Sequence, residues 1–209
     1  FTGVLFRDKI QEAFDNTDDD GHTTMPVISF DYRYSNLCNF KCRMCGEQLS
    51  SSWEAEKKLN NLWTIEEQPF MQKDVKKKMT SFQTEVVEPE FREAISKGIV
   101  EEIYWVGGEP LMYDIHWWAL EEMVKNGSAK NCYLRYNSNL SRTEFKGQKL
   151  FDYLPQFKDW LMCASIDGTG DVVEFIRKGI VWEEWLENFK EGLAAPGGKD
   201  RMRFDLTIT

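Results

Sequence analysis

The sequence predicts an α/β fold in which parallel strands alternate with helices. Two observations support this. Short runs rich in β-branched and aromatic residues recur from Val27 onward, and amphipathic stretches separate them. With 209 residues, 42% hydrophobic and 14% aromatic, the chain is long enough to fill a core. A disordered tail and a disulfide mini-protein are therefore excluded.

Five strands are expected, at residues 27–35, 99–106, 132–137, 161–166 and 202–209. Residues 1–26 are interpreted as an N-terminal extension, and residues 27–209 as the core. Because the chain stops inside an apparent strand, we expect the C-terminal part of the domain to be missing. The open sheet edge would then need another strand or a partner.

Helices are expected between these strands. Pro110 suits a first helical position, and residues 114–124 follow as a helix. Ser141 and Glu144 have the spacing of a capping box, which predicts a helix over residues 142–153. A third helix is indicated by apolar residues at helical spacing, and this stripe is interpreted as core packing. Its members are Trp182, Trp185, Leu186, Phe189 and Leu193.

The connection from residue 48 to residue 97 is polar, rich in Lys and Glu, and too long for a bare loop in a compact domain. We expect one or two helices in this insertion. Lys73, Lys76, Lys77 and Lys78 are interpreted as a solvated helix face, with a phosphate-binding patch as the alternative.

Charge and cysteine content narrow the choice of partners and compartment. The formal net charge of -9 argues against nucleic acid as a partner. No apolar run approaches the roughly 20 residues that a membrane span needs. The five cysteines are odd in number and three of them crowd together, unlike a secreted disulfide framework. A reducing, cytoplasmic location is expected.

The strongest chemical signal is the CxxxCxxC spacing of Cys38, Cys42 and Cys45, directly after the first strand. Three thiolates on one loop can hold a metal centre. A structural zinc site needs a fourth ligand. The candidates lie on other segments: His22, His116, Cys132 and Cys163. In a four-iron cluster, three cysteines leave one iron open to an external ligand.

A second signal, Gly107, Gly108, Glu109 and Pro110, follows the second strand and opens a helix. It lies at the carboxyl end of a strand, where α/β barrels build active sites. Two glycines let the backbone approach a ligand closely, and Glu109 can accept a hydrogen bond from an ammonium group.

These two motifs, in this order, resemble the radical S-adenosylmethionine (radical SAM) superfamily. The resemblance implies a partial (β/α)6 TIM-like barrel of parallel strands with a helical insertion after the first strand. It also implies that Cys38, Cys42 and Cys45 bind a four-iron four-sulfur cluster whose open iron is chelated by SAM. Reductive cleavage of SAM would then give a 5′-deoxyadenosyl radical that abstracts hydrogen from a substrate.

The resemblance also suggests which residues contact SAM. The Gly107 to Pro110 motif would hold the methionine end, and Met44 stands where the family usually has an aromatic residue near the adenine. The remaining candidates follow later strands: Ser138, Asn139, Ser165, Asp167 and Arg177. Among these, Arg177 would pair with the SAM carboxylate as a fork-shaped donor.

The closest likeness within the superfamily is to members with a SPASM or twitch domain, which implies an oxygen-sensitive enzyme. A peptide, protein or small-molecule substrate and a reductant such as flavodoxin or ferredoxin would be its partners. The alternatives are a zinc-stabilised, non-enzymatic interaction module and a degenerate family member. Cys132 and Cys163 fall inside predicted strands and are expected to be small buried hydrophobes.

Overall fold

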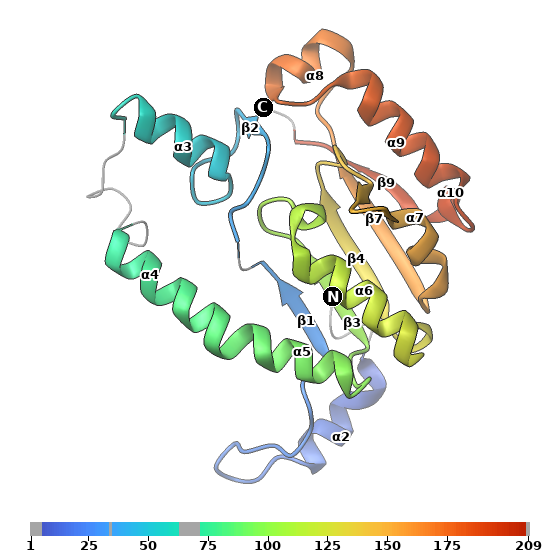
Figure 1. The fold of residues 1–209 in the computed structure, drawn as a ribbon. Coiled ribbons are helices and arrows are strands. Elements are labelled where there is room, and N and C mark those ends of the chain that lie inside the picture. Colours follow the sequence, from blue (N-terminus) through green and yellow to red (C-terminus); the bar gives the residue numbers. More distant parts are fainter. Residues whose placement is uncertain (1–5, 34, 63–71, 208–209) are drawn as a thin grey trace.

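In the computed structural model, which describes residues 6–33, 35–62 and 72–207, five strands form a parallel sheet in the order β1-β3-β4-β7-β9 (Figure 1). The strands are β1 (Ser29–Tyr32), β3 (Glu102–Trp105), β4 (Tyr133–Ser138), β7 (Asp159–Ser165) and β9 (Met202–Asp205). Strand order follows chain order and every pairing is parallel. The predicted α/β class and partial barrel are confirmed.

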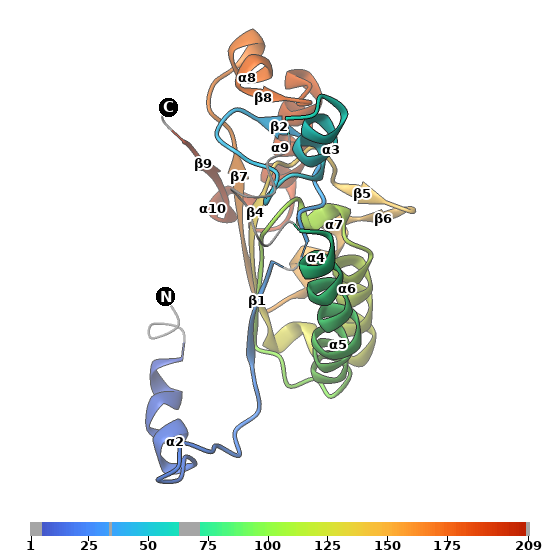
Figure 2. The same cartoon turned by 90° about the vertical axis from the view of Figure 1, so that its left-hand side faces the viewer.

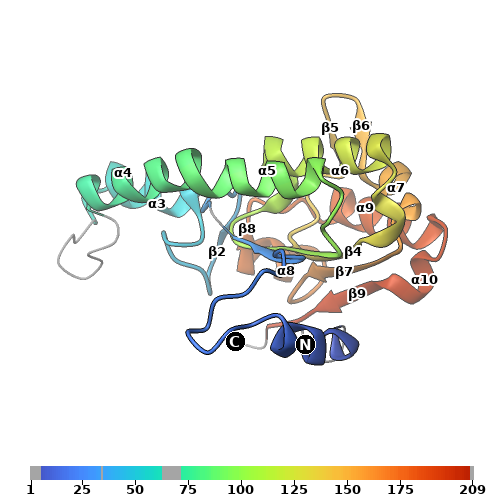
Figure 3. The same ribbon diagram turned by 90° about the horizontal axis from the view of Figure 1, so that it is seen from below.

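Helices cover one face of this sheet, whereas α2 (Ile10–Asp15) lies on the other side (Figures 2 and 3). The covering helices are α5 (Glu88–Ser96), α6 (Asp114–Asn126), α7 (Leu150–Tyr153) and α9 (Trp182–Ala194). Shorter segments join these elements: η1 (Arg7–Lys9), η4 (Pro110–Met112), η5 (Ala129–Asn131), η6 (Leu154–Gln156), α8 (Gly170–Ile176) and α10 (Gly198–Arg201). The predicted helix at residues 114–124 is confirmed.

Burial alternates along the central strands, as a sheet with one covered face requires. On β7, Trp160 and Met162 are buried under the helices, and α9 adds the buried Trp185 and Phe189. The aromatic stripe of α9 is therefore core packing, as predicted. Cys163 points to the opposite face and is only half-buried, so its assignment as a buried hydrophobe was wrong. Cys132 is buried, as expected.

The insertion contains more helix than expected. It holds α3 (Ser51–Leu59), α4 (Lys73–Phe82) and a π-helical turn, η3 (Gln83–Val87), which continues directly into α5. Its last part belongs to the core, because Phe91 and Ile95 of α5 are fully buried. On α4, Lys76 pairs with Glu54, whereas Lys73, Lys77 and Lys78 are exposed, which agrees with a solvated face.

The helix predicted over residues 142–153 is wrong for most of its length. The chain forms a hairpin of β5 (Glu144–Phe145) and β6 (Gln148–Lys149) before the single turn of α7. Lys146 and Gly147 both have positive φ, at 50° and 83°, as a tight two-residue hairpin turn requires. Phe145 then stacks on Trp117 of α6, with ring centroids 5.8 Å apart. This tertiary contact outweighs the local capping signal.

The N-terminal extension meets the core through an ion pair between Lys9 and Glu101. The boundary at residue 26 stays a prediction. Within the described part of the chain, no helix combines the length and the apolar character needed to cross a membrane.

The buried centre of the helical layer includes a histidine. His116 of α6 is fully buried among Trp105, Trp117 and Tyr136, and its Nε2 lies 3.0 Å from the Tyr136 hydroxyl. Its Nδ1 has no hydrogen-bond partner among the described residues. Burial lowers the pKa of His116 from 6.5 to about 3, so the ring is neutral in the folded protein.

This burial predicts a loss of stability on mild acidification. Below the unfolded pKa the unfolded chain binds a proton that the folded chain rejects, so the free energy of unfolding falls as pH decreases. Between about pH 7.5 and about pH 5.5, urea unfolding should show a His116-dependent loss of about 1.4 kcal/mol. His116→Gln should abolish this difference and His22→Gln, at an exposed position, should retain it. Equal pH dependence in wild type and His116→Gln would contradict the prediction.

Candidate functional site

The three clustered cysteines lie on a loop after β1, which we call the cysteine loop (residues 35–46). Within it, β2 (Lys41–Cys42) forms a short antiparallel ladder with β8 (Arg177–Lys178), so that Cys42 stands opposite Arg177. The Cys45 amide donates to the Cys42 carbonyl at 3.0 Å and closes a turn that keeps these two residues together. Local turn geometry and a distant strand therefore shape the loop jointly.

Side chains at the start of α3 donate hydrogen bonds to the backbone of the cysteine loop. The Ser50 side chain caps the helix by accepting from the Trp53 amide, and its hydroxyl donates to the Phe40 carbonyl at 2.6 Å. The Ser52 hydroxyl donates to the Cys38 carbonyl at 2.8 Å, and the Trp53 indole N–H to the Cys42 carbonyl at 2.8 Å. Sequence reasoning missed these supports, although Ser followed by an amphipathic run is a recognisable helix start.

The Gly107 to Pro110 motif contacts the cysteine loop through backbone hydrogen bonds. The Gly108 amide donates to the Ser35 carbonyl at 3.0 Å, and the Glu109 amide to the Leu37 carbonyl at 2.7 Å. A Cβ on Gly108 would stand 2.4 Å from the Leu37 oxygen, and Gly107 has a φ of 114°. These glycines are therefore required by the close approach of two backbone segments, in addition to the ligand approach inferred from sequence.

Five separate segments of the chain converge on one cavity of about 130 Å³. Most of the predicted site residues line it: Cys38, Cys42, Cys45, Gly107, Gly108, Ser138, Asn139, Ser165 and Arg177. Four other predicted residues are not among the residues that line the cavity: Met44, which packs against the core, and Glu109, Pro110 and Asp167. Asn137, which was not predicted, also lines the cavity.

Glu109 links the ends of two strands. Its carboxylate accepts from the Ser138 hydroxyl and the Asn139 amide, both at 2.7 Å, and from the Leu111 amide at 3.1 Å. Complete burial raises the pKa of Glu109 to about 7 despite these hydrogen bonds. Among the described residues no cation forms an ion pair with it, so an incoming ammonium group would be favoured here.

The turn after β4 adopts a glycine-like backbone without a glycine. Leu140 has a φ of 51° and is fully buried. Its carbonyl accepts from the Asn188 side chain at 2.9 Å, which fixes the turn. The Asn139 amide group reaches the Asn39 side chain at 3.0 Å and the Cys38 sulfur at 3.7 Å. The turn thus holds Asn139 beside the cysteine loop.

The thiols differ in acidity because their surroundings differ. Burial raises the pKa of Cys38 to about 11. The Cys42 thiol donates to the Cys45 sulfur, which raises the pKa of Cys42 and lowers that of Cys45 to about 7. Cys45 is therefore the most acidic of the three thiols.

Asp167 and Arg177 bind each other. The guanidinium donates from Nε to Asp167 Oδ2 at 2.6 Å and from Nη2 to Asp167 Oδ1 at 3.0 Å. Sequence analysis expected both residues beside SAM, but in the structure each is the principal partner of the other.

The chain matches the family model of the Radical SAM superfamily over residues 32–195. It therefore belongs to the radical SAM superfamily, whose members use a four-iron four-sulfur cluster and SAM as cofactors. The match contains every predicted site residue. Comparisons with curated proteins and with solved structures give no match.

The residues present fit these cofactors. Three cysteine sulfurs border one cavity, and two backbone or amide N–H groups point at Cys38 Sγ, as is common around cluster sulfurs. In the described part of the chain, no three or more His, Cys, Asp or Glu side chains gather closely enough to hold a metal ion.

Substitution of Gly108 tests the backbone contact beneath the cysteine loop. In Gly108→Ala the new methyl meets the Leu37 carbonyl, so we expect about 1–3 kcal/mol of destabilisation and less than half the wild-type iron content after anaerobic reconstitution. Gly46→Ala is the matched control on the same loop, because its methyl meets only the end of the flexible Gln48 side chain. Equal iron contents in the two variants would contradict this account.

Proposed function

We propose that the protein is an enzyme that cleaves SAM reductively at a cluster on Cys38, Cys42 and Cys45 and abstracts hydrogen from a substrate. One observation carries the proposal: the cysteine loop, the glycine turn and the ends of β4 and β7 meet at a single cavity. These segments are far apart in sequence, and each supplies the residue types that the family's chemistry needs.

The proposed contacts to SAM follow from this arrangement. Glu109, with Gly107, Gly108 and Pro110 in the same turn, would hold the methionine ammonium, since its buried carboxylate has hydrogen bonds but no ion pair among the described residues. The polar groups at the cavity wall are Ser138, Asn139 and Ser165, which would contact the rest of SAM. Met44 would pack near the adenine.

When bound, the cluster and SAM supply the one-electron cleavage and the 5′-deoxyadenosyl radical that abstracts hydrogen. The chain itself supplies position and shielding. Phe40 is fully buried and lines the cavity, and Ser50 and Trp53 fix the backbone that presents the thiols. The apolar Phe40 ring would help to keep water away from the reacting atoms.

The proposed partners are a peptide, protein or small-molecule substrate and a low-potential reductant such as flavodoxin or ferredoxin. The net charge of -9 argues against a nucleic-acid substrate. The proposal includes kinship with SPASM or twitch-domain members, oxygen sensitivity and a reducing, cytoplasmic setting. The last is supported by the free thiols of Cys38, Cys42, Cys45, Cys132 and Cys163.

Anaerobic purification tests the proposal directly. The protein should be brown, absorb near about 400 nm and contain about four iron and four sulfide per chain. With dithionite and SAM it should form 5′-deoxyadenosine, and Cys38→Ala should reduce this product by at least about 100-fold because one iron loses its ligand. Cys163→Ala, at a thiol outside the cavity, should behave as wild type.

The zinc-stabilised interaction module makes the opposite prediction. It requires a colourless protein with one zinc, no binding of SAM and no 5′-deoxyadenosine. A degenerate family member would hold the iron but form no 5′-deoxyadenosine. Either result would overturn the enzymatic proposal.

Glu109→Gln tests the ammonium site. The variant keeps the shape of the side chain but loses the charge. Its NH2 group would also face one of the two groups, the Ser138 hydroxyl or the Asn139 amide, that now donate hydrogen bonds to the carboxylate. SAM binding, measured by anaerobic calorimetry, should weaken about tenfold or more, since a hydrogen bond to a charged group contributes about 1.5–3 kcal/mol. Glu93→Gln, on the exposed surface of α5, is the control. Unchanged affinity in Glu109→Gln would remove Glu109 from the SAM site.

A further inference from the structure

The Asp167 and Arg177 pair is buried beside the thiols. Their side chains are only 1% and 8% exposed, and the contact is bidentate. Asp167 Oδ1 also accepts from the Thr207 amide at 2.9 Å, which anchors the carboxylate beyond the end of β9. A buried pair with this geometry is rigid, because separating its charges inside the protein is costly.

The remaining face of the guanidinium is directed at the cysteine loop. Arg177 Nη1 lies 3.8 Å from Cys42 Sγ, across the β2 and β8 ladder. The same segment clamps the loop by backbone contact. The Arg43 amide donates to the Ile176 carbonyl at 2.9 Å, and a Cβ on Gly179, whose φ is 115°, would lie 3.0 Å from the Asn39 oxygen. Arg177 is therefore held at a fixed distance from Cys42.

The arginine stands between Asp167 and the thiols, so its charge dominates on their side. Its Nε and Nη2 atoms face the Asp167 carboxylate, whereas its Nη1 atom faces the sulfur of Cys42. A fixed positive charge in a partly buried site stabilises added negative charge.

From this geometry we infer that Arg177, fixed by Asp167, is a positioning residue that raises the reduction potential of the cluster on the cysteine loop. The inference rests on the proposed function. Reduction adds an electron beside the Arg177 charge, and net charge and hydrogen bonds to the sulfurs are known determinants of cluster potentials. It gives the pair a different role from the contact to the SAM carboxylate that the sequence suggested.

The test is an anaerobic dithionite titration of the reconstituted protein without SAM, followed by electron paramagnetic resonance. Arg177→Gln should lower the midpoint potential by at least about 59 mV, a tenfold change in a one-electron equilibrium. Asp167→Asn removes the opposing charge and should leave the midpoint potential unchanged or raise it. A fall in Arg177→Gln without a fall in Asp167→Asn identifies a charge effect, whereas equal falls would indicate a disturbed loop and overturn the inference.

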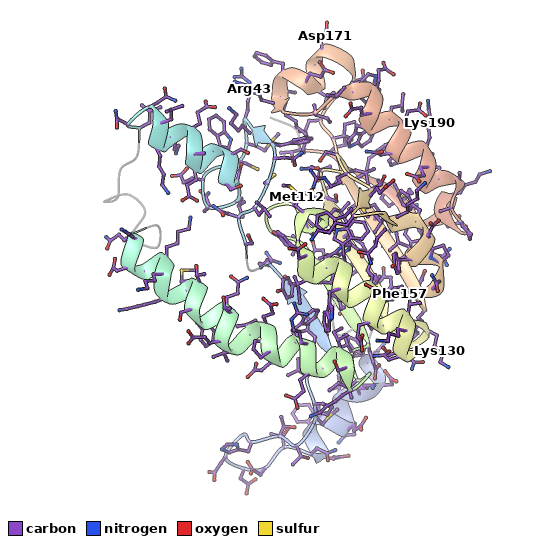
Figure 4. The ribbon with its side chains drawn as sticks, in the orientation of Figure 1. Arg43, Met112, Lys130, Phe157, Asp171 and Lys190 are labelled. Atoms are coloured by element: carbon purple, nitrogen blue, oxygen red, sulfur yellow. The ribbon has the colours of Figure 1, made fainter. Side chains whose placement is uncertain are left out.

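Arg43→Gln is the matched control. Arg43 is adjacent to Cys42 in sequence, but its side chain is exposed, with its guanidinium 3.7 Å from the centre of the Phe175 ring at the outer side of the loop beside α8 (Figure 4). Arg43→Gln removes the same unit of charge from a position that solvent screens. The midpoint potential of the cluster should therefore shift less than half as far as in Arg177→Gln. An equal shift in Arg43→Gln and Arg177→Gln would contradict a specific role for Arg177.

Two further measurements separate the possible failures. SAM affinity should stay within about threefold of wild type in Arg177→Gln. A tenfold loss of affinity with an unchanged potential would instead assign Arg177 to the SAM carboxylate.

If Arg177→Gln does not fold, the double variant Asp167→Asn with Arg177→Gln leaves a neutral amide pair. The midpoint potential of its cluster should still be lower than that of the wild type. A wild-type protein that takes up no cluster would refute the proposed function. A cluster-containing wild type with the same midpoint potential as Arg177→Gln and the double variant would refute only this inference.

Discussion

The close backbone contact between the cysteine loop and the Gly107 to Gly108 turn is the constraint on which the site depends. It joins the chain leaving β1 to the chain leaving β3, through hydrogen bonds from the Gly108 and Glu109 amides to Ser35 and Leu37. A side chain at position 108 would fill the space where the Leu37 carbonyl lies. Because parallel strands end at the same edge of the sheet, this contact brings two distant motifs into one place.

Electrostatics inside the site are local and differ from those of the whole chain. The protein carries a net charge of -9, yet each of its buried carboxylates is stabilised by different partners. Burial raises the pKa of Glu54, but hydrogen bonds from Lys58, Lys76 and Asn36 more than compensate and lower it to about 2. Asp167 has Arg177. Glu109 has only neutral donors among the described residues, which makes it the group that a cationic ligand would complete.

Sequence reasoning located the strands because their patterns follow from burial on one face of a sheet. It failed where a distant contact decided the local structure. The residues near Ser141 carry a helix-start signal, but Phe145 packs on Trp117 and the Lys146 and Gly147 turn closes a hairpin instead. Cys163 was misjudged because alternation along a strand gives no sign of which face the helices cover.

The sequence by itself determined the superfamily and the order of the motifs, and it supplied the residues proposed to bind a cluster and SAM, because these depend on residue type and spacing along the chain. The tertiary structure decided how these residues are combined. Only the pairing of β2 with β8 places Arg177 against Cys42, and only the convergence of β3 with β4 directs Ser138 and Asn139 to Glu109. Such contacts join residues from about 30 to about 135 positions apart, and no short-range pattern encodes them.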